Sequence, residues 1–336
     1  MKAAVLTEYR KIEIQDLPEP VPGPNDMLVR VMANGLCPND YRIYAGIATW
    51  KKPPTTLGHE PSGVVVEVGS NVKDFKPGDK VAGDTSTRCG YCKPCLEGRE
   101  NLCVNRRGSG NGALAEFVAG NEVYMNKFYK ASFEEEAFTE PLSCVINGIK
   151  NSKVKMGDTV AIVGSGQIGL MHMQVARLCG AKTVVLDLRP ERLAVAEKLG
   201  ADHTIDSSKT DPVAKIKELT GGEGADKVIV AIGDSRAIDT AMRLVSKVGS
   251  VNLFASVNPP APISVDPNLI HHEISLIGSY DKTRADLRLA TRIIDEGRID
   301  VKSLISHRFT LDRAGEAIEL LGQSAGVKIL VNPNSE

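Results

Sequence analysis

The sequence has few aromatic residues, no long apolar run and no excess of one charge sign. Phe, Tyr and Trp make up 4% of the 336 residues, and no internal repeat is visible. No apolar run approaches the ~20 residues that a membrane-spanning helix requires. The formal net charge of −1 gives no reason to expect a nucleic-acid partner or an anionic membrane surface. A globular protein of about two domains is the class that remains.

The N-terminus lacks the long apolar region of a secretory signal peptide, since residues 1–8 read MKAAVLTE. We therefore expect a cytoplasmic protein. Cysteines stay reduced in that compartment, so clustered cysteines indicate metal binding rather than disulfides.

The chain is organised around a glycine-rich turn between an apolar strand-like segment and a helix-like segment. The turn reads Gly164-Ser165-Gly166-Gln167-Ile168-Gly169. The first glycine permits a tight turn, the second lets a pyrophosphate approach the backbone, and the third lets the helix pack against the strand. The helix N-terminus offers free N–H groups to phosphates. Asp187 ends the next strand, 18 residues after Gly169, near the spacing expected of a carboxylate that binds an adenosine ribose. The stretch predicts a dinucleotide site.

Four of the seven cysteines are closely spaced, as Cys89-x2-Cys92-x2-Cys95-x7-Cys103. Four thiolates suit a closed tetrahedral zinc site with no open position, which is a structural rather than a catalytic site. The segment also holds two glycines and a proline and cannot build an apolar core, so metal would supply its folding energy. Redox thiols or a disulfide pair are the competing interpretations.

A second candidate metal site involves Cys37 and His59. A lone cysteine is more often a small buried apolar residue than a metal ligand. A lone histidine is as often a surface residue as a metal ligand. Asp40 follows the cysteine and Glu60 follows the histidine, and either carboxylate is a candidate to fix the tautomer of a zinc-bound imidazole.

Either Glu140 or Cys144 could be the third ligand of this site. They are four residues apart in a helical stretch, residues 133–150, and so share one helical face. An isolated glutamate at this position would more commonly be solvated.

From Asp158 to about Gly278 helices and strands alternate, which predicts an α/β domain with an open parallel sheet and helices on both faces. The predicted helices are Gln167–Cys179, Glu191–Leu199, Pro212–Leu219 and Arg236–Val245. The predicted strands are Thr159–Val163, Thr183–Asp187, Lys227–Ala231, Ser250–Phe254 and Ile274–Ile277.

The chain after Gly278 is too short for a third domain. Its pattern predicts helices at Asp286–Glu296 and Asp312–Leu321, and strands at Ile305–Phe309 and Lys328–Val331. We expect it to complete the first domain. The predicted domains are residues 1–146 with 279–336, carrying a zinc lobe at about 86–106, and residues 147–278.

These residues together resemble the zinc-containing medium-chain dehydrogenases, a family of alcohol, polyol and threonine dehydrogenases, over nearly the whole chain. The motifs responsible are Cys37 with Asp40, Gly58-His59-Glu60-x2-Gly63, the four clustered cysteines, Glu140-Pro141-Leu142, the glycine turn and Asp187. The resemblance implies a GroES-like, β-rich catalytic domain and a Rossmann NAD-binding domain. It also implies a homodimer or homotetramer.

The resemblance further implies two zinc ions per chain and a set of site residues. Cys37, His59 and Glu140 correspond to the catalytic zinc ligands, with Glu60 close to the metal and Asp40 orienting His59. Cys89, Cys92, Cys95 and Cys103 correspond to the structural zinc ligands. Asp187 and Arg192 correspond to the ribose contacts, and residues 254–256 to backbone near the nicotinamide. An acid at 187 favours NAD over NADP, although Arg189 tempers that preference.

The sequence departs from the family in the loop after Cys37. Many relatives carry Ser or Thr two residues after this cysteine and His five after it, and that pair relays the alcohol proton. Here the positions hold Asn39 and Arg42. An amide does not pass a proton as a hydroxyl does, and arginine stays charged. Asn39 could instead hold the substrate, and the proton could leave through Glu60, Tyr41 or water.

The implied reaction is NAD-linked oxidation of a secondary alcohol to a ketone. A carboxylate at 140 and polar residues at 39, 41 and 42 favour a polyol, a cyclitol or a sugar-derived alcohol. Threonine 3-dehydrogenation is the alternative, against which Arg42 argues because it repels an ammonium. A non-catalytic NAD(H)-binding protein that kept only the structural zinc is an alternative of another class. A zinc-free quinone reductase would not need these ligands.

Overall fold

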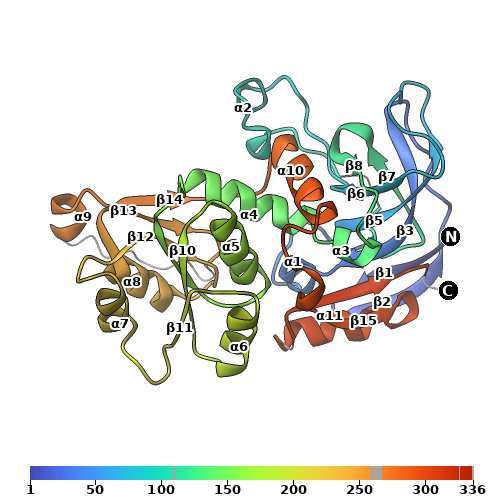
Figure 1. The fold of residues 1–336 in the computed structure, drawn as a ribbon. Helices are drawn as coiled ribbons and strands as arrows, with labels where there is room; N and C mark the ends of the chain where they lie inside the picture. Colours follow the sequence, from blue (N-terminus) through green and yellow to red (C-terminus); the bar gives the residue numbers. More distant parts are fainter. Residues whose placement is uncertain (109–110, 258–259, 261–266, 325, 335–336) are drawn as a thin grey trace. The chain divides into compact units, whose positions relative to one another are not determined.

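The computed structural model describes residues 1–336 except 109–110, 258–259, 261–266, 325 and 335–336. Contacts between residues divide the chain into two compact units (Figure 1). The first unit combines Met1–Ser143 with Lys282–Glu336, and the second is Cys144–Asp281. Among the described residues, no helix combines the length and apolar character needed to cross a lipid bilayer.

The first unit is rich in β-structure. Its larger sheet has the strand order β15-β16-β3-β5-β6-β8, with β7 also paired to β3, and its smaller sheet has the order β2-β1-β4. The last strand, β16, therefore joins the N-terminal strands in one sheet. The strands are β1 (Lys2–Glu8), β2 (Lys11–Asp16), β3 (Asp26–Gly35), β4 (Thr55–Thr56), β5 (Glu60–Val68), β6 (Lys80–Gly83), β7 (Phe117–Asn121), β8 (Met125–Lys127), β15 (Ile305–Thr310) and β16 (Lys328–Asn332).

Short helices surround these sheets. One apolar core joins the smaller sheet to α1 and α11, with Leu6, Tyr44 and Ile318 buried in it. The helices of this unit are α1 (Pro38–Tyr44), α2 (Lys93–Leu96), α3 (Phe133–Glu136), α10 (Arg284–Asp295) and α11 (Ala314–Gly322). Helix α4 (Thr139–Asn151) contains the first boundary between the units.

The second unit is a six-stranded sheet in which all neighbouring strands are parallel, in the order β11-β10-β9-β12-β13-β14. In chain order this is 3-2-1-4-5-6, the doubly wound arrangement of dinucleotide-binding domains, which confirms the predicted fold class. The elements are β9 (Thr159–Val163), α5 (Gln167–Leu178), β10 (Lys182–Asp187), α6 (Pro190–Lys198), β11 (His203–Asp206), α7 (Pro212–Leu219), β12 (Ala225–Val230), α8 (Ser235–Leu244), β13 (Val245–Leu253), α9 (Pro267–His271) and β14 (Ser275–Gly278).

The helical stretch predicted at residues 133–150 is two helices, α3 and α4. Ser132 caps α3 through a reciprocal pair of hydrogen bonds with Glu135, and the helix ends at Glu136. Pro141 has no N–H to donate to a preceding turn, so it is tolerated in the first turn of a new helix but not inside a continuous one. The break therefore falls just before it.

Two further differences lie in the second unit. Strand β11 was not predicted, because only Ile205 of its four residues is buried and the apolar signal is weak. Strand β13 begins at Val245, where the predicted helix was expected to end. The run Lys247-Val248-Gly249 resembles a turn, whereas it lies inside the strand with Val248 at φ 59°.

Candidate metal and cofactor sites

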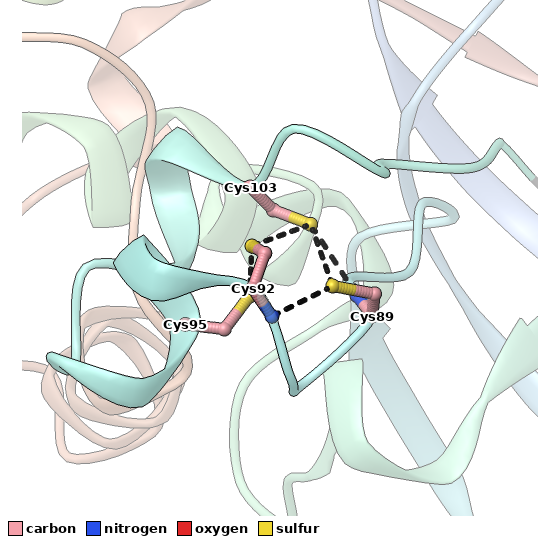
Figure 2. A group of neighbouring side chains, drawn as sticks. All are labelled: Cys89, Cys92, Cys95 and Cys103. Carbon is pink, nitrogen blue, oxygen red and sulfur yellow. Dashed lines mark hydrogen bonds between the residues drawn. The ribbon is translucent and has the colours of Figure 1, made fainter.

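The four clustered thiols converge in the lobe formed by residues 89–103 (Figure 2). The sulfur–sulfur distances are 3.5 Å from Cys92 to Cys95, 3.9 Å from Cys92 to Cys103 and 3.6 Å from Cys89 to Cys103. A tetrahedral zinc ion with Zn–S bonds of about 2.3 Å places its sulfurs about 3.8 Å apart. The thiols are therefore spaced for one zinc ion.

The lobe has little apolar core of its own. Leu96 and Val104 are 74% and 75% exposed, and Tyr91 is exposed as well. Helix α2 is a single turn that starts after Cys92 with Pro94 in its first positions. A segment of this kind depends on bound metal for its fold, which supports the structural assignment of these four cysteines.

A second set of metal-ligating atoms lies in the first unit. Cys37 is the residue before α1, His59 precedes β5, and Glu60 begins that strand. The ligand atoms of these three residues lie within 4.8 Å of one another. A thiolate, an imidazole and a carboxylate are ligands that zinc accepts in catalytic sites.

Asp40 holds both Cys37 and His59 in place. Asp40 is 1% exposed, and its carboxylate accepts hydrogen bonds from the N–H groups of Cys37 (2.9 Å) and Gly58 (3.2 Å). One oxygen also lies 3.5 Å from Nδ1 of His59. Burial alone would lower the pKa of His59, but Asp40 and Cys37 raise it well above its ordinary value. A carboxylate on Nδ1 leaves Nε2 for a metal, which supports the predicted orienting role.

Two buried ion pairs involve the carboxylates near this set. Glu60 pairs with Lys328, whose side chain is 0% exposed, and Glu140 pairs with Lys282, whose side chain is 3% exposed. Burial raises the pKa of Glu60; the Lys328 ammonium opposes that shift and the Glu140 charge adds to it. Among the described residues, the group of ligand atoms around Cys37 and His59 includes Glu60 and does not include Glu140. The assignment of Glu140 as a zinc ligand remains a prediction.

The glycine turn of the second unit has the geometry that its sequence predicts. Gly164 has φ 102°, and an added Cβ would lie 2.3 Å from Ile232. At Gly169 an added Cβ would lie 1.8 Å from the carbonyl oxygen of Gly164, so only glycine allows this close packing. The space above Gly166 is open within 4 Å, as a backbone that receives a phosphate requires. Gln167 and Ile168 begin α5, whose N-terminal N–H groups face the turn.

Asp187 ends β10 beside this turn. One carboxylate oxygen accepts hydrogen bonds from N–H (2.7 Å) and Oγ (2.8 Å) of Ser165, and the other accepts one from N–H of Arg189 (3.0 Å). A carboxylate has about four acceptor positions, so these bonds leave one for a ribose hydroxyl. Arg192 lies half-buried in the first turn of α6. Burial lowers its pKa and the charge of Asp187 opposes that shift. The residues present fit a nicotinamide dinucleotide.

Comparisons with known proteins match both parts of the chain. The family model of the alcohol dehydrogenase GroES-like domain matches residues 23–129, and that of the zinc-binding dehydrogenases matches residues 168–296. The chain is 33% identical to the sorbitol dehydrogenase of Halalkalibacterium halodurans over 348 residues, with 99% of each chain covered. It is also 33% identical to the D-arabitol-phosphate dehydrogenase of Enterococcus avium, covering 98% of this chain and 96% of that one. L-Threonine 3-dehydrogenases are relatives of similar identity, 29–32%.

Among solved structures, a zinc-binding dehydrogenase of Sinorhizobium meliloti bound to NADP matches with a TM-score of 0.93. Its sequence is 34% identical, and the match covers 99% of each chain. This chain belongs to the zinc-containing medium-chain dehydrogenases. The GroES-like and Rossmann architecture predicted from the sequence is confirmed. The chain is accordingly an oxidoreductase that acts on CH–OH groups, and a nicotinamide cofactor and zinc are expected.

The residues that depart from the medium-chain dehydrogenase pattern lie on α1. Asn39 is exposed in its first turn, and Arg42 is half-buried in its last turn. Tyr41 packs against the core shared with α11, and a Cβ on Gly322 would lie 2.0 Å from its ring. This packing gives Tyr41 a structural role and weakens it as a route for the proton.

Sequence reasoning missed Lys282 and Lys328. Glu140 and Lys282 are 142 residues apart, and Glu60 and Lys328 are 268 apart, so no local motif links the partners. Lysine is also one of the residues least often fully buried, and neither position carries a pattern that indicates burial. Only the fold brings each ammonium to its carboxylate.

Proposed function

We propose that this dehydrogenase oxidises a secondary alcohol of a polyol, a cyclitol or a sugar-derived alcohol to a ketone and transfers the hydride to NAD. The observation that carries the proposal is that the ligand atoms of Cys37, His59 and Glu60 lie together, with the imidazole of His59 oriented by Asp40. The sorbitol and arabitol-phosphate dehydrogenases among the relatives support this substrate class.

The first unit is proposed as the catalytic unit, with Cys37, His59 and Glu140 as zinc ligands. Zinc bound there would supply Lewis-acid polarisation of the substrate oxygen and lower the cost of forming an alkoxide. Asp40 fixes the orientation of His59, and the two buried lysines balance the charges of Glu60 and Glu140. Asn39, exposed beside Cys37, is proposed to bind a substrate hydroxyl rather than to relay its proton.

The second unit is proposed to bind NAD in preference to NADP. The open acceptor position of Asp187 suits a ribose hydroxyl, and its charge disfavours a 2′-phosphate. We further propose a cytoplasmic homodimer or homotetramer. Four thiols arranged for metal suit a reducing compartment. Strand β14 is the edge of its sheet and is largely exposed, with Leu276 38% exposed, which suits pairing with a second copy.

A substrate screen tests this proposal. NAD and NADP reduction would be followed with polyols, cyclitols, sugar phosphates and L-threonine. We expect turnover with a member of the polyol class and loss of turnover in Cys37→Ser. The control is Cys179→Ser, which changes the residue after α5 and should retain turnover. Preference for L-threonine would replace the proposed substrate. NAD binding with one zinc per chain and no turnover would make the protein a binder.

A further inference from the structure

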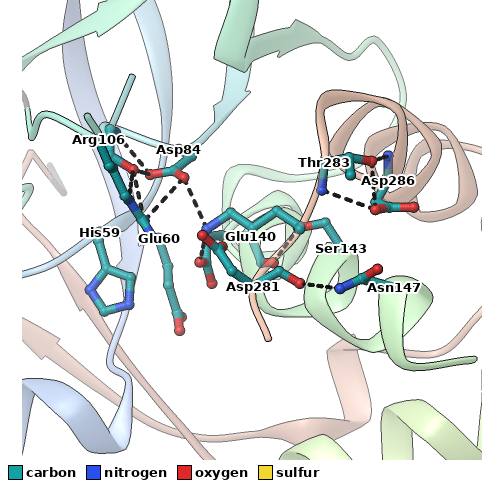
Figure 3. Close-up of polar contacts among 12 residues, drawn as sticks. His59, Glu60, Asp84, Arg106, Glu140, Ser143, Asn147, Asp281, Thr283 and Asp286 are labelled. Atoms are coloured by element: carbon teal, nitrogen blue, oxygen red, sulfur yellow. Dashed lines mark hydrogen bonds and ion pairs between the residues drawn. The ribbon is translucent and has the colours of Figure 1, made fainter. Parts of the chain in front are cut away.

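The ammonium of Lys282 lies between two buried carboxylates. Its Nζ is 2.9 Å from Asp84 and also forms an ion pair with Glu140. Figure 3 shows the two carboxylates, Asp84 and Glu140, near each other. The side chains of Lys282, Asp84 and Glu140 are 3%, 2% and 9% exposed. Charges this far from water interact strongly, because little solvent screens them.

Asp84 is held from several sides independently of Glu140. It accepts hydrogen bonds from N–H (2.9 Å) and Oγ (2.8 Å) of Ser86 and from the guanidinium of Arg88 (2.8 Å). Arg106 approaches it to 3.7 Å. Burial alone would raise the pKa of Asp84, but Lys282, Arg88 and Arg106 hold it well below its usual range. Asp84 is thus a fixed anion that anchors Lys282.

The anchored ammonium and a metal ion would bind the same carboxylate. A carboxylate oxygen that accepts a hydrogen bond from an ammonium has less electron density to donate to a metal ion. Altering a side chain that hydrogen-bonds to a metal ligand typically changes the metal affinity by about 10–100-fold. Lys282 therefore opposes metal binding by Glu140. Asp84 limits that opposition, because its negative charge offsets the ammonium and attracts Lys282 away from Glu140.

We propose that Lys282 is a positioning residue that competes with zinc for the carboxylate of Glu140, and that Asp84 sets how strongly it competes. The inference rests on the proposed assignment of Glu140 as a zinc ligand. It predicts that removing the lysine charge tightens the catalytic metal site and that removing the aspartate charge loosens it.

Metal affinity of the full-length protein tests the inference without reference to turnover. Cobalt(II) would be loaded after zinc is removed from the catalytic site alone, and its affinity measured by chelator competition and by the visible bands of thiolate-bound cobalt. The site is identified by loss of these bands in Cys37→Ser. We expect Lys282→Met to lower the dissociation constant about tenfold or more, and Asp84→Asn to raise it by a similar factor. Lys282→Arg, which keeps the charge, should stay near the wild-type value.

Arg106→Met is the matched control. It also removes one positive charge near Asp84 but leaves the Lys282–Glu140 ion pair in place. If it tightens cobalt binding as much as Lys282→Met does, net charge alone explains the effect and the proposal is wrong. An unchanged or weaker affinity in Lys282→Met would also overturn it. Lys282→Gln repeats the measurement if the methionine variant does not fold.

Glu140→Gln separates this inference from the proposed function. If it leaves cobalt affinity unchanged, Glu140 is not a ligand, and the proposed ligand set falls together with the inference. If it weakens cobalt binding while Lys282→Met has no effect, the ligand set stands and only the role of Lys282 is refuted.

Discussion

The hydroxyl of Thr139 donates a hydrogen bond of 2.6 Å to one oxygen of Glu136, a glutamate that is fully buried. Among the described residues, the other oxygen has no partner. Burial raises the pKa of Glu136 to about 8, and the hydrogen bond from Thr139 only partly opposes this shift. The carboxyl therefore keeps its proton at neutral pH in the folded protein.

This relationship predicts how stability depends on pH. In the unfolded chain Glu136 loses its proton near its ordinary value of 4.5, whereas in the folded protein it keeps it up to about pH 8. The contribution of Glu136 to the free energy of unfolding is complete below pH 4.5. It falls by about 1.4 kcal/mol per pH unit as the pH rises toward 8. Glu136→Gln cannot ionise, so its free energy of unfolding relative to the wild type should rise by roughly 4–5 kcal/mol between pH 4.5 and pH 8.

Urea unfolding between pH 5 and pH 8.5 measures the difference. The exposed Glu19→Gln is the control and should follow the wild-type curve. Parallel curves for Glu136→Gln and the wild type would show that the buried carboxyl is ionised in the folded state.

The ion pair of Lys328 and Glu60 gives a second prediction. The ammonium also donates to the carbonyl oxygen of Leu36 (3.2 Å) and lies over the ring of Phe138. Lys328→Met leaves a buried carboxylate without its counter-charge, which costs about 3–5 kcal/mol. The double variant Lys328→Met with Glu60→Gln removes both charges and should recover at least half of that loss.

Guanidinium unfolding of both single variants and the double variant completes the cycle. Lys11→Met is the control, because Lys11 forms an exposed pair with Glu13 and should leave stability nearly unchanged. Additive losses in the double variant would mean that Lys328 and Glu60 stabilise the fold independently.

The parts of the molecule that could be predicted are those whose residues lie close together in the chain. The glycine turn and the four-cysteine lobe each fit within a few turns of structure, and their spacing alone indicates a ligand. Asp40 and Glu60 were both candidates to orient His59 because they follow the proposed ligands closely in the chain, and the family resemblance favoured Asp40. Lys282 and Lys328 reach their partners only through the tertiary fold, and the partners' positions are not encoded in any local pattern.

Secondary structure was predicted best where periodicity is strong. Strands β9 and β10 are continuous apolar runs buried on both faces, and their predicted limits agree with the structure to within a residue. Two features were missed because no periodic apolar pattern marks them. Strand β11 has only one buried residue, and the break between α3 and α4 depends on a proline.

A third prediction concerns the four-cysteine lobe. Substituting one of its cysteines should lower the stability of the protein before it lowers turnover. Cys95→Ser removes one of four thiolates, and a lobe without an apolar core has no other source of folding energy. We expect about one zinc fewer per chain by metal analysis and a melting temperature several degrees lower. Trypsin should also cleave faster at Arg99, which lies inside the lobe. Cys179→Ser is the matched control. Wild-type stability combined with lost turnover would contradict a structural role for the lobe.

The last prediction concerns cofactor choice at Asp187. Removing a carboxylate that accepts a ribose hydrogen bond costs about 1.5–3 kcal/mol, so Asp187→Ala should weaken NAD binding about tenfold or more. The same change removes a charge that repels a 2′-phosphate, so NADP binding should change little or improve. Fluorescence titration with NADH and NADPH measures both affinities.

Ser165→Ala is the control for the structural contacts of Asp187, because it removes the hydroxyl that donates to the carboxylate and leaves the charge in place. It should weaken both cofactors slightly and equally. If Asp187→Ala also weakens NADH and NADPH by the same factor, the carboxylate only shapes the turn through Ser165, and the preference for NAD must come from other residues.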